Sequence, residues 1–400
     1  MRPTWIVLGL VVGLGAVGYV KLRERKGGTA PDGAPLSRPA ADLVAKSPEP
    51  APVPAGPKPT PANAAGAPSE LDAKALAAQQ GPDLAAEAAA ALLRRDASAL
   101  RAANDVAGAE ALEKRLDAEH AETLEASRAA LERGLRDARV ALKDARPLPE
   151  RLPFADRARH DLSRAVLLPE LFDGSGRPTE ERSHLLTAIY RLNSMVMTAR
   201  PPVAGVTTEY EVKPGEAPVQ IVSRQRLPYG SNVILFWNRG GDLDPLRLVA
   251  GERILLPVET LEVRVSRARH LLGLYLGGAL VKEFDVGVGK PESPTPTGVF
   301  DVTDKYRNPT WDVPPEIWKA GMPRRIHYGD PRNELGDAWI PIKSAEHPKG
   351  YGIHGTVRPE TVGSDCSNGC VRLRNEHAVE LMDWVRTASA GGTATKVIIR

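Results

Sequence analysis

The stretch Ser367-Asn368-Gly369-Cys370-Val371-Arg372-Leu373 stands near the C-terminus of this chain of 400 residues. Sixteen residues before its cysteine stands His354, within Tyr351-Gly352-Ile353-His354-Gly355-Thr356. A thiol, an imidazole, glycines beside both and an arginine two residues after the sulfur are the components of a thiolate acyl-transfer site. Because the whole sequence has two cysteines, general disulfide stapling explains neither of them.

The chemistry of Cys370 depends on its ionisation. A free thiol has a pKa of about 8.5, and a neighbouring imidazolium lowers that pKa to about 3.5–7.5. His354 is the natural partner, because a glycine-flanked strand end lets an imidazole approach another strand closely. The second ring nitrogen of His354 then needs an acceptor that orients the ring.

Other groups near Cys370 are candidates for the same site. The backbone amides of Gly369 and Cys370 could point at a developing oxyanion, since glycine permits a tight turn and a close approach. Arg372 would share a strand face with Cys370. It could hold a substrate carboxylate or stabilise the turn, and we favour the structural role.

Together these residues resemble a known family. The pair His354-Gly355 and the pattern Ser367-x-Gly369-Cys370-x-Arg372 are similar to the motifs of the L,D-transpeptidases of bacterial cell-wall synthesis. The resemblance covers about residues 261–400. It implies a mainly-β catalytic domain over 260–400 that works without a cofactor.

The resemblance also implies a reaction and roles for the site residues. Cys370 would attack a peptidoglycan tetrapeptide stem between its third residue, often meso-diaminopimelate, and the terminal D-alanine. A thioester would form, D-alanine would leave, and an amine of a second stem would resolve the thioester into a 3→3 crosslink. The carbonyl of Gly355 would orient His354. The oxyanion and substrate-binding residues would be Ser367, Asn368, Gly369 and Arg372, with Asn368 standing where many members carry a second histidine. The acceptor is left open: a stem peptide, water, a free D-amino acid or a protein amine.

Other interpretations of the same residues are open. A cysteine peptidase or carboxypeptidase, or a sortase-like enzyme acting on wall peptides, fits the order and spacing of His354 and Cys370 less well. A catalytically idle wall-binding scaffold would not need both residues. A zinc site could be drawn from both cysteines, His354 and His377, but C-x3-C spacing is unusual for structural zinc, and we predict no metal. We expect Cys366 to be a buried, inert thiol rather than the disulfide partner of Cys370.

Residues 261–400 have the pattern of strands. Leu261, Val263 and Val265 alternate with polar residues, and Gly277-Gly278 between two apolar runs predicts a hairpin. The segment 294–300 predicts a turn into a strand. Residues 376–385 favour a helix and 396–399 a closing strand. Between Tyr306 and Trp339, the aromatic residues indicate a substrate-facing flap, with buried aromatic core as the alternative; the tryptophans of this stretch are Trp311, Trp318 and Trp339.

Residues 207–258 resemble a lysin motif, a strand–helix–helix–strand module that binds glycan strands of peptidoglycan or chitin. The resemblance rests on the segments 210–216, 234–238 and 249–257. Ala217-Pro218 departs from the family at the start of the first helix, although proline is acceptable at a first helical position. The alternative is a packing domain for the neighbouring catalytic domain.

The first half of the chain has two compositions. Residues 27–69 are rich in Pro, Ala and Gly and poor in large apolar residues, which predicts a disordered spacer. Residues 70–200 predict a helical region, with amphipathic segments at about 154–173 and 179–199 joined by a turn at 173–176. Three- and four-residue steps place one apolar face on Leu112, Leu116, Leu124, Leu131, Leu135, Ala138 and Leu142.

Residues 1–26 carry a charge-free apolar run from Trp5 to Val20, followed by Lys21, Arg23, Arg25 and Lys26. The run is short for a membrane span, which needs about 20 residues, and it fits a signal anchor or a signal peptide. We favour an uncleaved anchor in the cytoplasmic membrane, with the rest of the chain in the periplasm or cell envelope among stem peptides and glycan strands. The net charge of +3 does not predict nucleic-acid binding.

Overall fold

The computed structural model describes residues 106–240, 248–315, 317–348, 350–390 and 393–400. The predicted N-terminal segment 1–26, the spacer 27–69 and the start of the helical region lie outside these residues, so their assignments stay predictions. Among the described helices, none combines the length and the apolar character that crossing a membrane requires.

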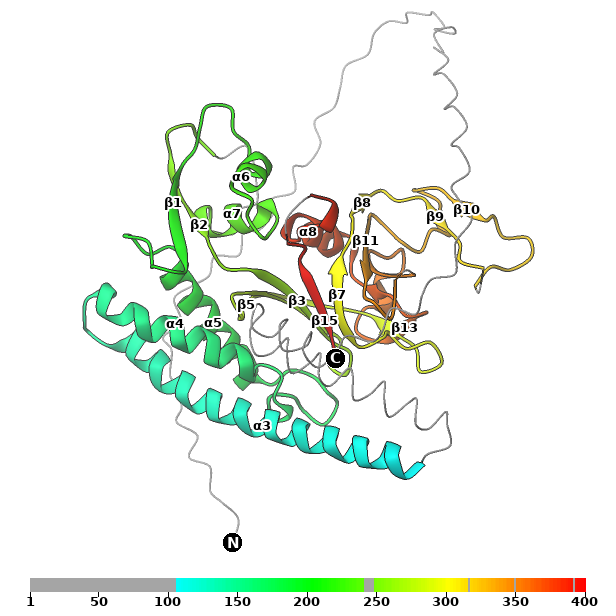
Figure 1. The fold of residues 1–400 in the computed structure, drawn as a ribbon, viewed down its shortest axis with the longest axis horizontal. Helices are drawn as coiled ribbons and strands as arrows, with labels where there is room; N and C mark the ends of the chain where they lie inside the picture. Colours follow the sequence, from blue (N-terminus) through cyan, green and yellow to red (C-terminus); the bar gives the residue numbers. More distant parts are fainter. Residues whose placement is uncertain (1–105, 241–247, 316, 349, 391–392) are drawn as a thin grey trace, which may run out of the picture. The chain divides into compact units, whose positions relative to one another are not determined.

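A nine-stranded mixed sheet forms the centre of the C-terminal part (Figure 1). Its strand order is β14-β12-β11-β7-β15-β3-β4-β5, with β8 paired to β11. The pairs β15–β3 and β12–β14 are parallel and the other pairs are antiparallel. The strands are β3 (Leu261–Ser266), β4 (Leu271–Leu276), β5 (Ala279–Asp285), β7 (Gly298–Val302), β8 (Tyr306–Arg307), β11 (Ala338–Lys343), β12 (Tyr351–His354), β14 (Val371–Arg372) and β15 (Lys396–Ile399). The mainly-β architecture expected of 260–400 is confirmed.

Local sequence signals explain several of these elements. Gly277 and Gly278 have φ of 59° and 89°, as a two-residue hairpin turn between β4 and β5 requires. The helix α8 (Asn375–Trp384) and the strand β15 match the predicted helix and closing strand. Shorter elements complete this part of the chain: β6 (Val288–Gly289) pairs with β13 (Asp365–Ser367), β9 (Trp311–Asp312) pairs with β10 (Arg325–Ile326), and η3 (Pro359–Thr361) and η4 (Ala388–Ala390) are 3-10 turns.

Upstream lie the predicted helices α3 (Val106–Lys143), α4 (Leu148–Ala165) and α5 (Glu180–Met197), with η1 (Pro169–Leu171) between the last two. Leu135 was expected on the apolar face of α3 but is 51% exposed. Gly134 faces α4 instead, because a Cβ there would come within 2.6 Å of the Leu162 side chain. Gly134 therefore lies where α3 packs closely against α4. The predicted apolar face of α3 is wrong at Leu135.

Residues 207–257 have the expected order of elements: β1 (Thr207–Glu211), α6 (Pro218–Gln225), α7 (Ser231–Asn238) and β2 (Arg253–Pro257), with β1 antiparallel to β2. Pro218 is the first helical residue of α6. This module packs on the C-terminal end of α8, where Gly230 N donates to Trp384 O at 2.7 Å and the Phe236 ring meets Trp384 edge-on at 5.2 Å. The module therefore contacts the catalytic domain, which both interpretations allow, and the lysin-motif identity stays a prediction.

The helical region docks on the exposed edge of the sheet, strand β5. Leu280 N donates to Ser163 Oγ at 2.8 Å, and Asn193 Nδ2 donates to Leu280 O at 2.8 Å. Polar side chains of α4 and α5 thereby satisfy backbone groups that an edge strand leaves without a partner strand. Arg182, which is 1% exposed, holds both carboxylate oxygens of Glu283 at 3.0 and 2.5 Å. The helices are consequently a structural part of the sheet domain.

Replacing Arg182 by methionine should lower the free energy of unfolding by about 3–5 kcal/mol, because it leaves the Glu283 carboxylate, which is only 15% exposed, without its partner. Arg133→Met is the matched control: Arg133 pairs with Asp161 while its own side chain is 48% exposed, so solvent screens the pair and the loss of stability should be much smaller. Denaturant unfolding of both variants measures the difference. Equal losses would contradict a docking role for the buried pair.

Candidate active site

The register of two short strands brings the thiol and the imidazole to one face of the sheet. In the parallel pair β12–β14, Ile353 lies opposite Val371 and His354 opposite Arg372. Ile353 and Val371 point into the core, where they are 0% and 1% exposed. Side chains alternate along a strand, so Cys370, directly before β14, falls on the face of His354 and Arg372.

The turn that carries the cysteine is fixed by Ser367 and Gly369. Gly369 has φ of 110°, and a Cβ there would come within 2.8 Å of the Tyr351 ring, so glycine is required. Ser367 Oγ donates to Cys370 O at 2.6 Å and accepts from Gly369 N at 3.1 Å. The Gly369 amide is therefore engaged inside the turn. Its role towards an oxyanion stays a prediction, and the contacts of Ser367 are those of a residue that holds the turn.

His354 has the orienting acceptor that the resemblance to the L,D-transpeptidases implied. Its Nδ1 lies 2.6 Å from the carbonyl oxygen of Gly355. A carbonyl can only accept, so Nδ1 carries the proton and Nε2 keeps its lone pair. Burial lowers the pKa of His354 to about 4; the Arg372 charge acts the same way, against hydrogen bonds to the carbonyls of Gly355 and Glu334. The imidazole is neutral at pH 7.

The same burial affects the sulfur. Desolvation raises the pKa of the Cys370 thiol to about 11, although the Gly352 amide and the Arg372 charge act in the opposite direction. The thiol hydrogen points towards Gly350 O, 3.9 Å from Sγ. Both shifts favour a neutral thiol and a neutral imidazole at rest rather than the thiolate–imidazolium pair expected from the sequence, and desolvation is the largest cause of each.

Arg372 has a structural partner. It is 4% exposed and forms an ion pair with Glu334, whose other oxygen accepts from Arg358 Nη2 at 2.6 Å. The favoured structural role of Arg372 fits these contacts. Asn368 is exposed, and its role stays a prediction.

Trp339 forms one side of the site. It lies on β11 opposite His354, with the two ring centroids 5.8 Å apart. Gly352 makes room for it, since a Cβ there would meet the indole at 2.3 Å. Trp311, by contrast, belongs to a separate apolar cluster, for which the buried-core alternative holds; that cluster contains Trp311, Val313, Ile326 and Leu335, with Trp318 and Trp339 packed against it.

The sequence interpretation missed Glu334 and Asn375. Glu334 gave no signal, since a single acidic residue in a loop is common. Asn375 stands where the predicted helix begins, a position at which asparagine is often structural. Its carboxamide oxygen contacts the backbone just after His354, as the amide of Thr356 donates to it at 2.9 Å.

Cys366 is free and half-buried on β13, and a Cβ at Gly287 would come within 2.5 Å of its sulfur. The zinc arrangement drawn from both cysteines, His354 and His377 is not formed: within the described ranges, the ligand atoms of these residues give no group of three within 4.8 Å of one another.

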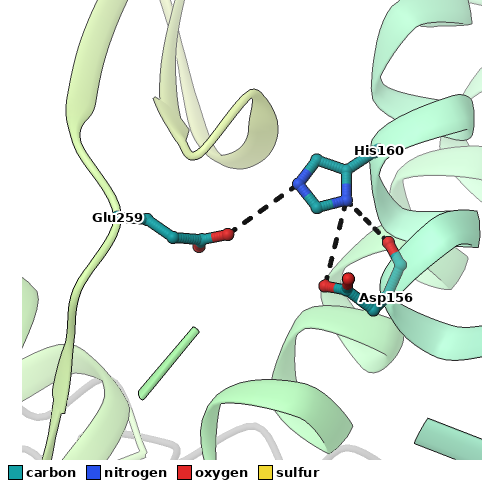
Figure 2. A group of neighbouring side chains, drawn as sticks. All are labelled: Asp156, His160 and Glu259. Carbon is teal, nitrogen blue, oxygen red and sulfur yellow. Dashed lines mark hydrogen bonds and ion pairs between the residues drawn. The ribbon is translucent and has the colours of Figure 1, made fainter. Parts of the chain in front are cut away.

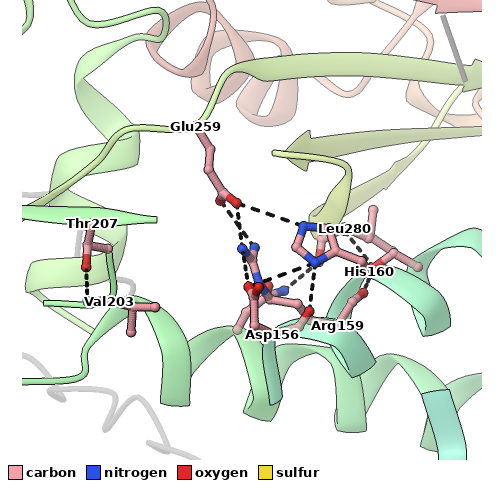
Figure 3. Close-up of polar contacts among 9 residues, drawn as sticks. Asp156, Arg159, His160, Val203, Thr207, Glu259 and Leu280 are labelled. Carbon is pink, nitrogen blue, oxygen red and sulfur yellow. Dashed lines mark hydrogen bonds and ion pairs between the residues drawn. The ribbon is translucent and has the colours of Figure 1, made fainter. Parts of the chain in front are cut away.

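Another group of three potential metal-ligating side chains does meet the 4.8 Å distance. Asp156 and His160 of α4 and Glu259, just before β3, place one potential ligand atom each within 4.8 Å of the others (Figure 2). Figure 3 shows that Arg159 lies among them. This fully buried guanidinium donates to Asp156 Oδ1 at 2.8 Å and to Glu259 Oε1 at 2.6 Å. The carboxylates thus already have a cation, and the trio is a docking contact between α4 and the sheet domain.

Comparison with known proteins gives the class of this domain. Residues 260–399 match the model of the L,D-transpeptidase catalytic domain of YkuD type. YkuD of Bacillus licheniformis, assigned as an L,D-transpeptidase, is 32% identical over 182 residues, which are 44% of this chain and 92% of that protein. YqjB of Bacillus subtilis, assigned likewise, is 35% identical over 125 residues, 31% of this chain and 65% of that protein.

Among solved structures, the catalytic domain of an Enterococcus faecium L,D-transpeptidase is 24% identical with a TM-score of 0.26, over 36% of this chain and 98% of that one. The family match assigns residues 260–399, which contain His354 and Cys370, to the YkuD-type catalytic domain. The chain belongs to the L,D-transpeptidase family.

The pH dependence of Cys370 alkylation tests the neutral pair. Only the thiolate reacts, so with a pKa near 11 the rate with iodoacetamide should rise about tenfold per pH unit up to about pH 9. Mass spectrometry on a Cys366→Ser background, which leaves one cysteine, follows the reaction. A plateau reached below about pH 8 would indicate a stable thiolate–imidazolium pair instead.

Proposed function

We propose that this chain is a peptidoglycan L,D-transpeptidase that uses Cys370 as its nucleophile. The observation that carries the proposal is the register of β12 and β14, which puts His354 and the cysteine turn on one face of the sheet. Family membership supports the same reaction class. The substrate would be a tetrapeptide stem, cleaved between its third residue and D-alanine.

The first half-reaction follows from the neutral pair. As Cys370 Sγ attacks the stem carbonyl, Nε2 of His354 takes the thiol proton, so no free thiolate accumulates. The Nδ1–H bond to Gly355 O holds the ring in the tautomer that leaves Nε2 available. The tetrahedral intermediate collapses to a thioester when the C–N bond to D-alanine breaks. The imidazolium returns its proton to the departing amine.

The second half-reaction reverses these roles. An acceptor amine attacks the thioester carbonyl, His354 takes the amine proton, and the C–S bond breaks to regenerate the thiol with that proton. An amine of a second stem gives a 3→3 crosslink, and water gives a carboxypeptidase product. The backbone amide of Cys370 is our candidate oxyanion donor, because the Gly369 amide is engaged with Ser367.

Arg372 contributes charge rather than a substrate contact. Its buried guanidinium lowers the pKa of both His354 and Cys370, so it opposes the imidazolium and favours the thiolate. Glu334 partly offsets that charge through its ion pair with Arg372. Because Arg372 is 4% exposed, we assign recognition of substrate carboxylates to other, accessible groups.

The setting of this activity is the cell envelope, where the stems and glycan strands lie. The module over 207–258 is proposed as a glycan-binding element, and an N-terminal anchor stays a prediction for residues outside the described part of the chain. A cysteine peptidase or carboxypeptidase differs from this proposal in the acceptor, and an idle scaffold differs in forming no acyl-enzyme.

Incubating the full chain with purified disaccharide-tetrapeptide should add to the protein the mass of the substrate less D-alanine. Cys370→Ala should abolish the adduct, because the nucleophile is gone, whereas Cys366→Ala should retain it. Intact-protein mass spectrometry measures both, and the released products identify the acceptor. An adduct that persists in Cys370→Ala, or none in the wild-type chain, would overturn the proposed mechanism.

A further inference from the structure

Asn375 makes contacts that neither the motif nor the proposed reaction explains. It is the first residue of α8, and its Oδ1 accepts from two backbone amides: Thr356 N at 2.9 Å and Asp337 N at 3.1 Å. These amides belong to separate loops, one directly after β12 and one directly before β11. One carboxamide oxygen therefore joins three segments beside His354.

The geometry of the peptide bond makes the contact with Thr356 important. The N–H of Thr356 and the C=O of Gly355 are the two ends of one planar peptide group. That C=O is the acceptor for His354 Nδ1 at 2.6 Å. Because Asn375 fixes the direction of the Thr356 N–H, it also fixes the direction in which the Gly355 C=O points towards the imidazole. Hydrogen bonds at both ends of a peptide group also polarise each other.

Two glycines give the carboxamide its place. A Cβ at Gly336 would lie 2.1 Å from Oδ1 of Asn375, and a Cβ at Gly355 would lie 2.2 Å from it. Gly336 also has φ of 62°. Any side chain at either position would displace the oxygen, so the glycine after the catalytic histidine is explained by Asn375 as well as by strand packing.

Backbone contacts hold the other sides of the histidine. Gly355 N donates to Ala338 O at 3.1 Å, and Leu373 N donates to His354 O at 2.8 Å. The first bond fixes the peptide before Gly355 to the neighbouring strand. The peptide after Gly355, whose carbonyl faces the imidazole, is held through its N–H by Asn375.

We propose that Asn375 is a positioning residue for His354. It holds the Gly355–Thr356 peptide so that the carbonyl keeps the proton of the imidazole on Nδ1 and leaves Nε2 as the base. The inference rests on the proposed function for the role of His354 in catalysis, but the tautomer itself is a property of the free enzyme. Asn375 thus acts through the peptide and touches no reacting atom.

The test uses the full chain with ¹⁵N-labelled histidine. Asn375→Leu removes the acceptor at similar volume, and Asn375→Asp keeps an acceptor oxygen at a helix N-terminus, where a negative charge is favourable. Asn193→Leu is the matched control. It removes another buried carboxamide that binds a backbone group, Leu280 O, but this contact lies on strand β5 and not beside His354. Ring ¹⁵N shifts give the tautomer of His354, and acyl-enzyme formation gives the rate.

We expect the Nδ1–H tautomer of His354 in the wild type, in Asn375→Asp and in Asn193→Leu. Asn375→Leu should give a mixture of tautomers and acylate about 10- to 100-fold more slowly, with the larger change in kcat than in KM. Asn375→Asp should stay within about threefold of the wild-type rate. Asn193→Leu should lower the melting temperature without changing the tautomer.

Two results would overturn the inference: a wild-type His354 protonated on Nε2, or a folded Asn375→Leu variant with an unchanged tautomer. If Asn375→Leu fails to fold, Asn375→Ala is measured in its place. A wild-type His354 protonated on Nε2 overturns the inference whatever the variants show. A wild-type chain that forms no acyl-enzyme refutes the proposed function, whereas the ¹⁵N shifts still test the role of Asn375.

Discussion

The parallel pairing of β12 with β14 is the interaction on which the site depends. Ladder contacts set Ile353 against Val371 and His354 against Arg372, and Leu373 N extends the pairing by donating to His354 O at 2.8 Å. A slip of one residue would send the imidazole into the core and a valine or isoleucine to the site face. The two core side chains thus fix the register, and the register fixes which polar groups meet.

Burial then determines the charge state of those groups. The imidazole is buried and the thiol partly buried, and desolvation favours the neutral form of each. With a pKa of about 4 for His354 and of about 11 for Cys370, both groups are neutral in the resting state at pH 7. In the mechanism we propose, the thiol loses its proton only as it attacks the substrate. Between turnovers it stays protonated and therefore reacts slowly with small oxidants and electrophiles.

Helix α8 links the site to the rest of the chain. Its first residue, Asn375, contacts the loop after His354, and its last, Trp384, accepts a hydrogen bond from Gly230 of the 207–257 module. At the β5 edge of the sheet, Ser163 of α4 and Asn193 of α5 bind the backbone of Leu280. Segments that lie before the catalytic domain in the sequence therefore contact it at two places, the end of α8 and the edge strand β5.

The sequence by itself indicated the family and the mainly-β domain, placed His354 and Cys370 in the candidate site, and through the family resemblance gave the Gly355 carbonyl as the acceptor for His354. These features depend on local motifs, on alternation and on residue types whose chemistry is specific. The tertiary structure decided what depends on distant neighbours: the opposite shifts in pKa, which come from burial; the engagement of the Gly369 amide by Ser367; and the ion pair that occupies Arg372. Glu334 and Asn375 lie 20 residues before His354 and 21 after it, and no local pattern indicates that folding brings both against that histidine.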